Sequence, residues 1–376
     1  MKEKLFLLVG FSLAFLSGSC LPANVLPSTA TPQQPTAALL PDIDASNPYP
    51  LAGPGPYGVG MRSFKAVDSA RGDREVGITV WYPAVPAAGD DVMEPVKDAR
   101  PDGGGAPYPL ILSSTKVAKI LAPYLVSRGF TWASVDGIDY YLSMGESMID
   151  QPLDILFALN QVAIYPPEGL EGLIDTEHAG AIGYSFDGYN ALAMSGARID
   201  PAYYLAQCPD PDLETQAILG SLSAFSCAPA RDWDEFIAHA GKSVAESEDG
   251  LWQPMTDERI RAVMPMACEG WWLFGERGLA AVDRPILMLA GSKDALYKEN
   301  VLIFNHLGTS DKSMIVFMDQ DHMMIYDTGM IERIAHFAIA FFGCHLQGRR
   351  DLAQYFSQEF VASHADLAWE LEDRVQ

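Results

Sequence analysis

Three residues that together could carry out nucleophilic catalysis occur in the chain order serine, aspartate, histidine. Ser185 lies in the stretch G-Y-S-F-D-G at residues 183–188, directly after an apolar run and directly before a helix-like segment. A serine at such a strand–turn–helix apex is exposed for attack on a carbonyl carbon. The usual pattern is G-x-S-x-G, and Asp187 occupies the place of the second glycine. The motif by itself is therefore weak evidence for a nucleophile.

Two later residues supply what a serine nucleophile needs, a base and a carboxylate that orients the base. Asp294 follows the apolar run 286–290, and His322 follows the apolar run 314–318. If both runs are strands of one parallel sheet, the two side chains lie at the same edge as Ser185, in the order expected for an α/β-hydrolase. Three other aspartates precede the strand or adjoin the base and are weaker candidates for the acid: Asp283, Asp319 and Asp321.

The elements that must position these residues alternate along the chain. Strands are expected at 58–68, 75–83, 109–114, 130–135, 179–182, 259–266, 284–291 and 313–318. Helices are expected at 117–128, 147–163, 189–194 and 330–342. This alternation predicts an α/β fold with a mostly parallel central sheet and helices on both faces. The first two strands have no helix between them and predict an antiparallel edge, and residues 199–257 interrupt the pattern as an inserted cap.

The tetrahedral intermediate of acyl transfer also needs backbone N–H donors for its oxyanion. The N–H of Phe186 is one candidate, because it follows the nucleophile and begins a helix whose dipole favours negative charge. A second donor is expected from the loop after the strand at 109–114.

The N-terminal region indicates export. Lys2 and Lys4 precede an apolar run at 5–16, and small residues lead to Cys20. This arrangement predicts a signal peptide at 1–20 of the lipoprotein type, with Cys20 lipidated and the protein anchored to the bacterial cell membrane. Simple secretion into the periplasm or medium, or an uncleaved anchor, are the alternatives. A Pro/Ala/Thr-rich tether at 21–48 then leads to a folded domain at 49–376.

The composition excludes some functions. The formal net charge of −24 argues against nucleic-acid partners, whose phosphates attract Lys and Arg. No C-x-x-C or H-E-x-x-H pattern occurs, so we expect neither a metal site nor a cofactor. Since an exported protein can form disulfides, Cys208 and Cys227 are predicted to pair. The alternative is that the cysteines are buried free thiols.

These features resemble the α/β-hydrolase superfamily, and within it the dienelactone-hydrolase-like and platelet-activating-factor-acetylhydrolase-like esterases of bacteria. The resemblance covers roughly residues 55–370 and is carried by short stretches at 59–62, 81–84, 108–113, 183–186, 274–279 and 366–369. It implies a serine carboxylic-ester hydrolase with Ser185, Asp294 and His322 as its triad. Serine stands where true dienelactone hydrolases have a cysteine nucleophile.

Two departures from that family concern the oxyanion. Family members carry Ser-His-Gly after the strand at 108–113, whereas this chain has Ser114-Thr115-Lys116. The match would make Val117 the second oxyanion donor. Asp187 beside the nucleophile would oppose oxyanion charge unless it faces away or is paired, and Lys116 is a candidate partner for it.

Three functions follow as alternatives. The first is hydrolysis of small or lipid-like esters, with an apolar substrate group favoured by Tyr184, Phe186, Trp132 and the aromatic residues of the cap. The second is a catalytically impaired hydrolase-fold binding protein of the cell envelope, which the two departures motivate. The third is a peptidase or thioesterase that uses the same triad.

Overall fold

Strands without exposed residues form the centre of the fold. Every residue of the segments YPLILSS (108–114) and ILMLAG (286–291) is buried, as in parallel strands covered on both faces. The structure is a computed structural model and describes residues 47–86, 91–137, 144–208, 226–246 and 248–370. The signal segment with Cys20 and nearly all of the tether lie outside the described residues.

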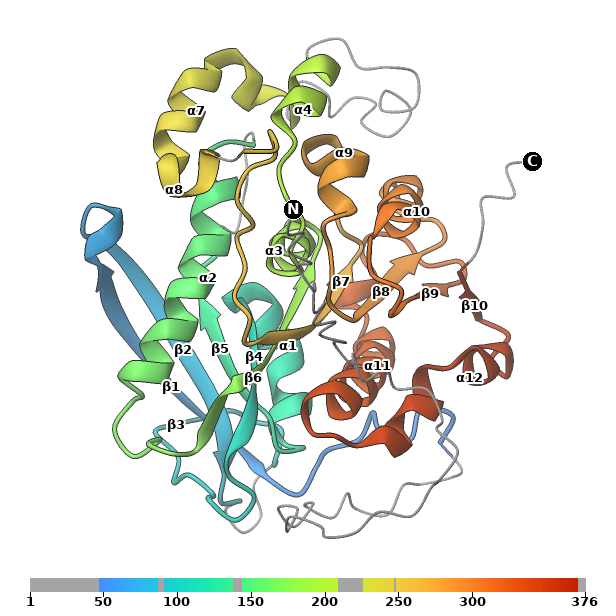
Figure 1. Ribbon diagram of the computed structural model, residues 1–376. Coiled ribbons are helices and arrows are strands. Elements are labelled where there is room, and N and C mark those ends of the chain that lie inside the picture. The colour runs from blue at the N-terminus through green and yellow to red at the C-terminus, as the bar shows by residue number, and fades with distance from the viewer. Residues whose placement is uncertain (1–46, 87–90, 138–143, 209–225, 247, 371–376) are drawn as a thin grey trace, which may run out of the picture.

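Ten strands form one sheet (Figure 1). They are β1 (Gly58–Asp68), β2 (Arg74–Ala84), β3 (Val96–Lys97), β4 (Tyr108–Ser114), β5 (Thr131–Val135), β6 (Ile174–Tyr184), β7 (Ile260–Met266), β8 (Ile286–Gly291), β9 (Lys312–Phe317) and β10 (Leu367–Trp369). The spatial order is β10-β9-β8-β7-β6-β4-β5-β2-β1-β3. All pairs from β9 to β5 are parallel, which confirms the predicted α/β fold with a mostly parallel sheet.

The edges of the sheet differ in part from the prediction. β1 and β2 form the expected antiparallel hairpin, joined by the short helix η1 (Ser69–Arg71). β3 pairs beyond β1, and β10 pairs antiparallel with β9 at the opposite edge. These two strands have only 2 and 3 residues, too few for a recognisable alternation of polar and apolar residues.

Helices cover both faces of the sheet. One core lies against α1 (Thr115–Val126) and α11 (Thr328–Leu346), and the other lies against α2 (Ser147–Ile164), α3 (Phe186–Met194), α9 (Trp271–Leu279) and α10 (Tyr297–His306). Within β4, Leu110 and Leu112 belong to one core and Ile111 to the other, the two-residue period of a strand. The C-terminal region adds η4 (Met324–Tyr326), η5 (Arg350–Phe356) and α12 (Gln358–Ala362).

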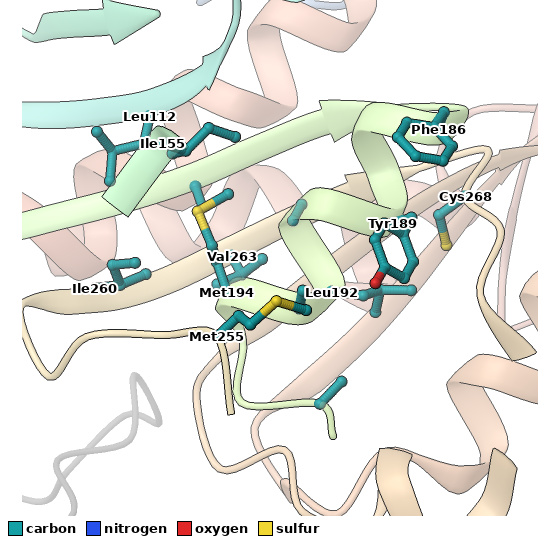
Figure 2. Packing of buried hydrophobic residues seen from close by; sticks show 14 of the residues in the cluster. Leu112, Ile155, Phe186, Tyr189, Leu192, Met194, Met255, Ile260, Val263 and Cys268 are labelled. Carbon is teal, nitrogen blue, oxygen red and sulfur yellow. The ribbon is translucent and has the colours of Figure 1, made fainter. Parts of the chain in front are cut away.

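The helix that follows the nucleophile is buried along its whole length. All residues of α3 are buried, and Figure 2 shows Leu192 and Met194 of α3 beside Val263 of β7. Cys268, just past the end of β7, lies beside Tyr189 in the same view. The position of Ser185 is therefore fixed by the packing of α3 against β7.

The segment predicted as a cap does interrupt the alternation of strands and helices. It contains α4 (Pro201–Gln207), η3 (Ala228–Asp232), α7 (Trp233–Ala240) and α8 (Lys242–Ala245). A disulfide joins Cys208 to Cys227. The rings of Tyr204 and Trp272 lie 5.6 Å apart between α4 and α9, and Figure 1 shows α4 next to α9.

Among the described residues, no helix combines the length and apolar character that crossing a bilayer requires.

Candidate active site

A sharp turn carries the chain from β6 into α3 at Ser185. Its φ of 60° and ψ of −123° lie in a region that residues with a side chain rarely adopt. The Ser185 N–H donates to the carbonyl of Met266 on β7 at 3.0 Å, and its own carbonyl accepts the N–H of Gly188 at 2.8 Å. The neighbouring strand and the following helix thus hold the strained residue in the strand–turn–helix arrangement.

The two glycines of the motif allow this turn to pack closely. A Cβ at residue 183 would lie 1.8 Å from the carbonyl oxygen of Asp187, and a Cβ at residue 188 would lie 2.5 Å from the Cβ of Cys268. Neither distance is tolerable, so both positions require glycine. The second glycine is at residue 188, one residue later than in the usual G-x-S-x-G pattern, because residue 188 packs against Cys268 in the turn after β7.

The three residues named from the sequence form one chain of hydrogen bonds. His322 Nε2 lies 3.0 Å from Ser185 Oγ, and His322 Nδ1 lies 2.9 Å from Asp294 Oδ2 and 3.1 Å from Oδ1. The side chain of Asp294 is 1% exposed and that of His322 is 35% exposed. Asp294 Oδ1 also accepts the N–H of Leu296 at 2.8 Å. A buried carboxylate, an imidazole and a hydroxyl in this sequence can activate the hydroxyl as a nucleophile.

The weaker acid candidates have other partners. Asp283 pairs with Arg284 at 2.7 Å, and Asp319 pairs with Lys293 at 2.9 Å. Asp321 Oδ1 accepts the N–H of Met323 at 2.8 Å. Within the described part of the chain, Asp294 is the one carboxylate that hydrogen-bonds the His322 ring.

The loop that carries His322 is tied to the turn that carries the serine. Tyr184 immediately precedes Ser185, and its hydroxyl donates to the backbone carbonyl of His322 at 2.7 Å. The Tyr184 ring lies 5.4 Å from the imidazole. Burial raises the pKa of Tyr184, so the phenol stays a hydrogen-bond donor at neutral pH. Tyr184, the variable residue between Gly183 and Ser185, therefore helps to hold the His322 backbone in place.

Replacing Tyr184 by phenylalanine should lower kcat for a small ester about tenfold, with little change in KM, because the His322 loop loses a fixed contact. Unfolding free energy should fall by about 1–2 kcal/mol. Tyr189→Phe is the matched control, because the buried Tyr189 hydroxyl donates to the Met148 carbonyl at 2.9 Å, away from His322. Equal losses of kcat in both variants would show that Tyr184 has no special role in placing the base.

The two predicted oxyanion donors lie in the first turns of two helices. Phe186 begins α3, and Val117 is the third residue of α1. The N-terminal N–H groups of a helix have no acceptor within it and carry partial positive charge. The loop expected before α1 is absent, since β4 ends at Ser114 and α1 starts at Thr115. The Thr115 hydroxyl donates to the Val135 carbonyl at 2.9 Å, which holds this early helix start.

Asp187 does not pair with Lys116, so that prediction is wrong. The Asp187 carboxylate accepts a hydrogen bond from the Ser114 hydroxyl, and its Oδ1 lies 3.3 Å from Asn190 Nδ2. Lys116 is exposed and forms no ion pair with any described residue. Ser114, rather than Lys116, bonds Asp187 because Ser114 ends β4, which pairs with β6, the strand that leads into the Ser185 turn. Its bond joins the first turns of α1 and α3, which places Val117 and Phe186 on neighbouring helix ends.

A second group of polar residues near the triad was missed from the sequence. Cys268, Glu269 and Gly270 lie within four residues of the end of β7, as Asp294 lies within three residues of the end of β8, and this position past a strand end was the available signal. Glu299 and Asn300 of α10 hydrogen-bond this turn. Burial raises the pKa of Glu269 to about 7 and that of Glu299 to about 8. These are the directions expected of a partly buried carboxyl, Glu269, and a fully buried one, Glu299, that each lie near other carboxyls.

The expected apolar lining is wrong for Trp132. This residue is fully buried, and its indole N–H donates to Ser113 Oγ at 2.8 Å. The cap aromatics Phe236 and Trp252 are also buried and pack against each other at 5.6 Å. Two large apolar side chains that follow His322 closely in the chain are exposed, Met323 at 59% and Tyr326 at 57%. The sequence missed them because exposure depends on the neighbouring loops.

The described residues contain no group of three or more His, Cys, Asp or Glu side chains able to hold a metal ion. No family model matches the chain, and no curated protein is significantly similar to it in sequence. The geometry of the site therefore carries the functional argument.

Proposed function

We propose that this chain is a serine ester hydrolase of the α/β-hydrolase type that acts outside the cytoplasm on small or lipid-like carboxylic esters. The observation that carries the proposal is the hydrogen-bond chain from Ser185 through His322 to Asp294, with Ser185 at a strained turn before a helix. The chain order of these residues also supports it, since α/β-hydrolases place serine, acid and histidine in this order.

The reaction would proceed through an acyl-enzyme. Ser185 Oγ attacks the ester carbonyl while His322 Nε2 takes its proton, and Asp294 stabilises the imidazolium that forms. The N–H groups of Phe186 and Val117 would hold the oxyanion. The imidazolium then gives its proton to the departing alcohol oxygen. Water, deprotonated by His322, then attacks the acyl carbon, and the imidazolium returns the proton to Ser185 Oγ as the acid leaves. The residues of the chain suffice for each of these proton transfers.

The surroundings favour uncharged or apolar substrates. The imidazole protonates the alcohol oxygen, so the alcohol part of the ester lies on the side of His322. Met323 and Tyr326 follow His322 and are exposed, so they could contact an apolar alcohol group. The net charge of −24 would repel polyanionic substrates.

A fluorophosphonate probe tests the proposal directly, because it labels only an activated serine hydroxyl. We expect one covalent adduct on Ser185, found by peptide mass spectrometry, together with hydrolysis of short-chain p-nitrophenyl esters. Ser185→Ala should abolish the adduct and His322→Ala should slow its formation. Ser363→Ala, at an exposed serine of the C-terminal region, should label normally. Absence of both labelling and hydrolysis by the folded wild-type protein would refute the proposal.

Two observations favour the alternative of an impaired binding protein. The second oxyanion donor has no loop of its own, because α1 begins directly after β4. The carboxylate of Asp187 also lies in the first turn of α3, where it offsets the helix dipole. A protein with this defect would react with the fluorophosphonate and yet turn over esters negligibly. The labelling and hydrolysis measurements together separate the two functions.

A further inference from the structure

The turn at residues 267–270 lies between the nucleophile and the acid. It follows β7, which lies between β6 and β8 in the sheet. The Met266 carbonyl accepts the N–H of Ser185 at 3.0 Å, and the N–H of Ala267 donates to the Leu289 carbonyl of β8 at 2.8 Å. The His322 ring bonds Asp294, which follows β8, through Nδ1 and Ser185, which follows β6, through Nε2, so the ring lies over the end of β7 between them. The turn is thus placed beside the imidazole.

This turn is held by two buried polar side chains of α10. Glu299 Oε1 accepts the N–H groups of Gly270 at 2.8 Å and Trp271 at 3.0 Å. Asn300 accepts the N–H of Cys268 at 3.0 Å and donates to its carbonyl at 3.0 Å. Glu299 and Asn300 are 2% and 0% exposed. Such buried polar bonds are costly to leave unmade, so the backbone on both sides of Glu269 is fixed.

Glu269 is the residue of this turn that carries a carboxyl. No described residue hydrogen-bonds its side chain, which is partly exposed. Burial raises its pKa, the positive charge of a protonated His322 opposes that rise, and the negative charge of Asp294 adds to it. Glu299 of α10 is the further carboxyl that interacts with it. The Glu269 carboxyl therefore interacts electrostatically with both His322 and Asp294.

We propose that Glu269 is a positioning residue that acts through His322, its ionised carboxylate favouring the imidazolium that forms when His322 takes the proton of Ser185. The inference rests on the proposed ester hydrolase function. It differs from the role of Asp294, which touches the imidazole and fixes its orientation. Glu269 contributes charge from the turn after β7, whose backbone on both sides of Glu269 is held by α10.

The sign of the effect follows from reciprocity between the two groups. A protonated His322 favours the ionised form of Glu269, so an ionised Glu269 favours protonated His322 to the same extent. Removing the carboxylate has two consequences. The imidazolium of the transition state is less stabilised, which lowers the maximal rate. The resting imidazole also loses its proton more readily, which moves the acidic limb of the rate profile to lower pH.

The test is the pH dependence of kcat/KM for a p-nitrophenyl ester in Glu269→Gln. We expect a maximal value about three- to tenfold lower and an acidic limb moved down by about 0.5–1 pH unit. Glu276→Gln is the matched control, because Glu276 is an exposed glutamate of α9 and its variant should keep both values. Glu269→Asp, which retains a carboxylate, should restore part of the wild-type profile. A folded, active Glu269→Gln protein with an unmoved acidic limb would overturn the proposal.

NMR titration of the His322 ring in the wild-type protein gives a readout that needs neither the variant nor turnover. We expect two coupled inflections, one from the imidazole and one from the Glu269 carboxyl. A single, independent ionisation would overturn the proposal even if Glu269→Gln failed to fold. If the wild-type protein hydrolysed no ester but showed the coupled titration, the proposed function would fail while the Glu269–His322 coupling remained.

Discussion

Replacing Asp294 by asparagine should lower kcat for a short-chain ester by about 10⁴-fold at neutral pH, the scale expected when a triad histidine is held in the wrong tautomer. The structure gives a specific reason. Asp294 Oδ1 accepts the N–H of Leu296 at 2.8 Å, and Oδ2 lies 2.9 Å from His322 Nδ1. The asparagine carbonyl would keep the Leu296 bond, so its NH₂ group would face Nδ1. The proton of the imidazole would then sit on Nε2, which could no longer accept the proton of Ser185.

The measurement is a steady-state comparison with Asp283→Asn, which makes the same chemical change at an aspartate that pairs with Arg284. That control should stay within a factor of about two of wild type, as expected for a surface position. Thermal unfolding of both variants checks that they are folded. A folded Asp294→Asn protein with more than about one tenth of wild-type kcat would contradict the role given to Asp294.

The sequence was sufficient for the parallel part of the sheet and for the three residues of the hydrogen-bond chain because both depend on local patterns. Buried parallel strands are continuous apolar runs, and the residue that follows each run lies at the same edge of the sheet. Asp294 and His322 could be named on that ground, without any knowledge of which strands are neighbours. The start of α1 at Thr115 could not be predicted in this way, because it depends on a contact between the Thr115 hydroxyl and the carbonyl of Val135 on β5.

The surroundings of the triad depend on strand order, which local patterns do not contain. Glu269 could not be named from the sequence because its place depends on β7 lying between β6 and β8, the strands that Ser185 and Asp294 follow. The predicted partner of Asp187 was wrong for a similar reason. Charge alone suggested Lys116, but the end of β4 places the Ser114 hydroxyl against the carboxylate. Tertiary contacts also explain the late glycine, since residue 188 meets Cys268.

Replacing Gly183 by alanine should lower the free energy of unfolding by about 3 kcal/mol, at the upper end of the cost of overpacking. The added Cβ would lie 1.8 Å from the carbonyl oxygen and 2.2 Å from the carbonyl carbon of Asp187. Both are backbone atoms in the first turn of α3, so no side-chain rotation can relieve the clash. The turn itself must shift, and it carries Ser185 at a strained φ of 60°.

Activity should fall further than stability alone explains. A displacement of about 1 Å at the reacting group costs about 10²-fold in rate, so kcat should drop by that factor in protein that is still folded. Gly103→Ala is the matched control, because a Cβ at residue 103 would meet no atom within 4 Å, and this variant should match wild type in both measurements. Urea unfolding and p-nitrophenyl ester hydrolysis separate the two effects. A Gly183→Ala protein with wild-type stability and kcat would mean that the turn can open without loss, and that its close packing does not hold Ser185 against His322.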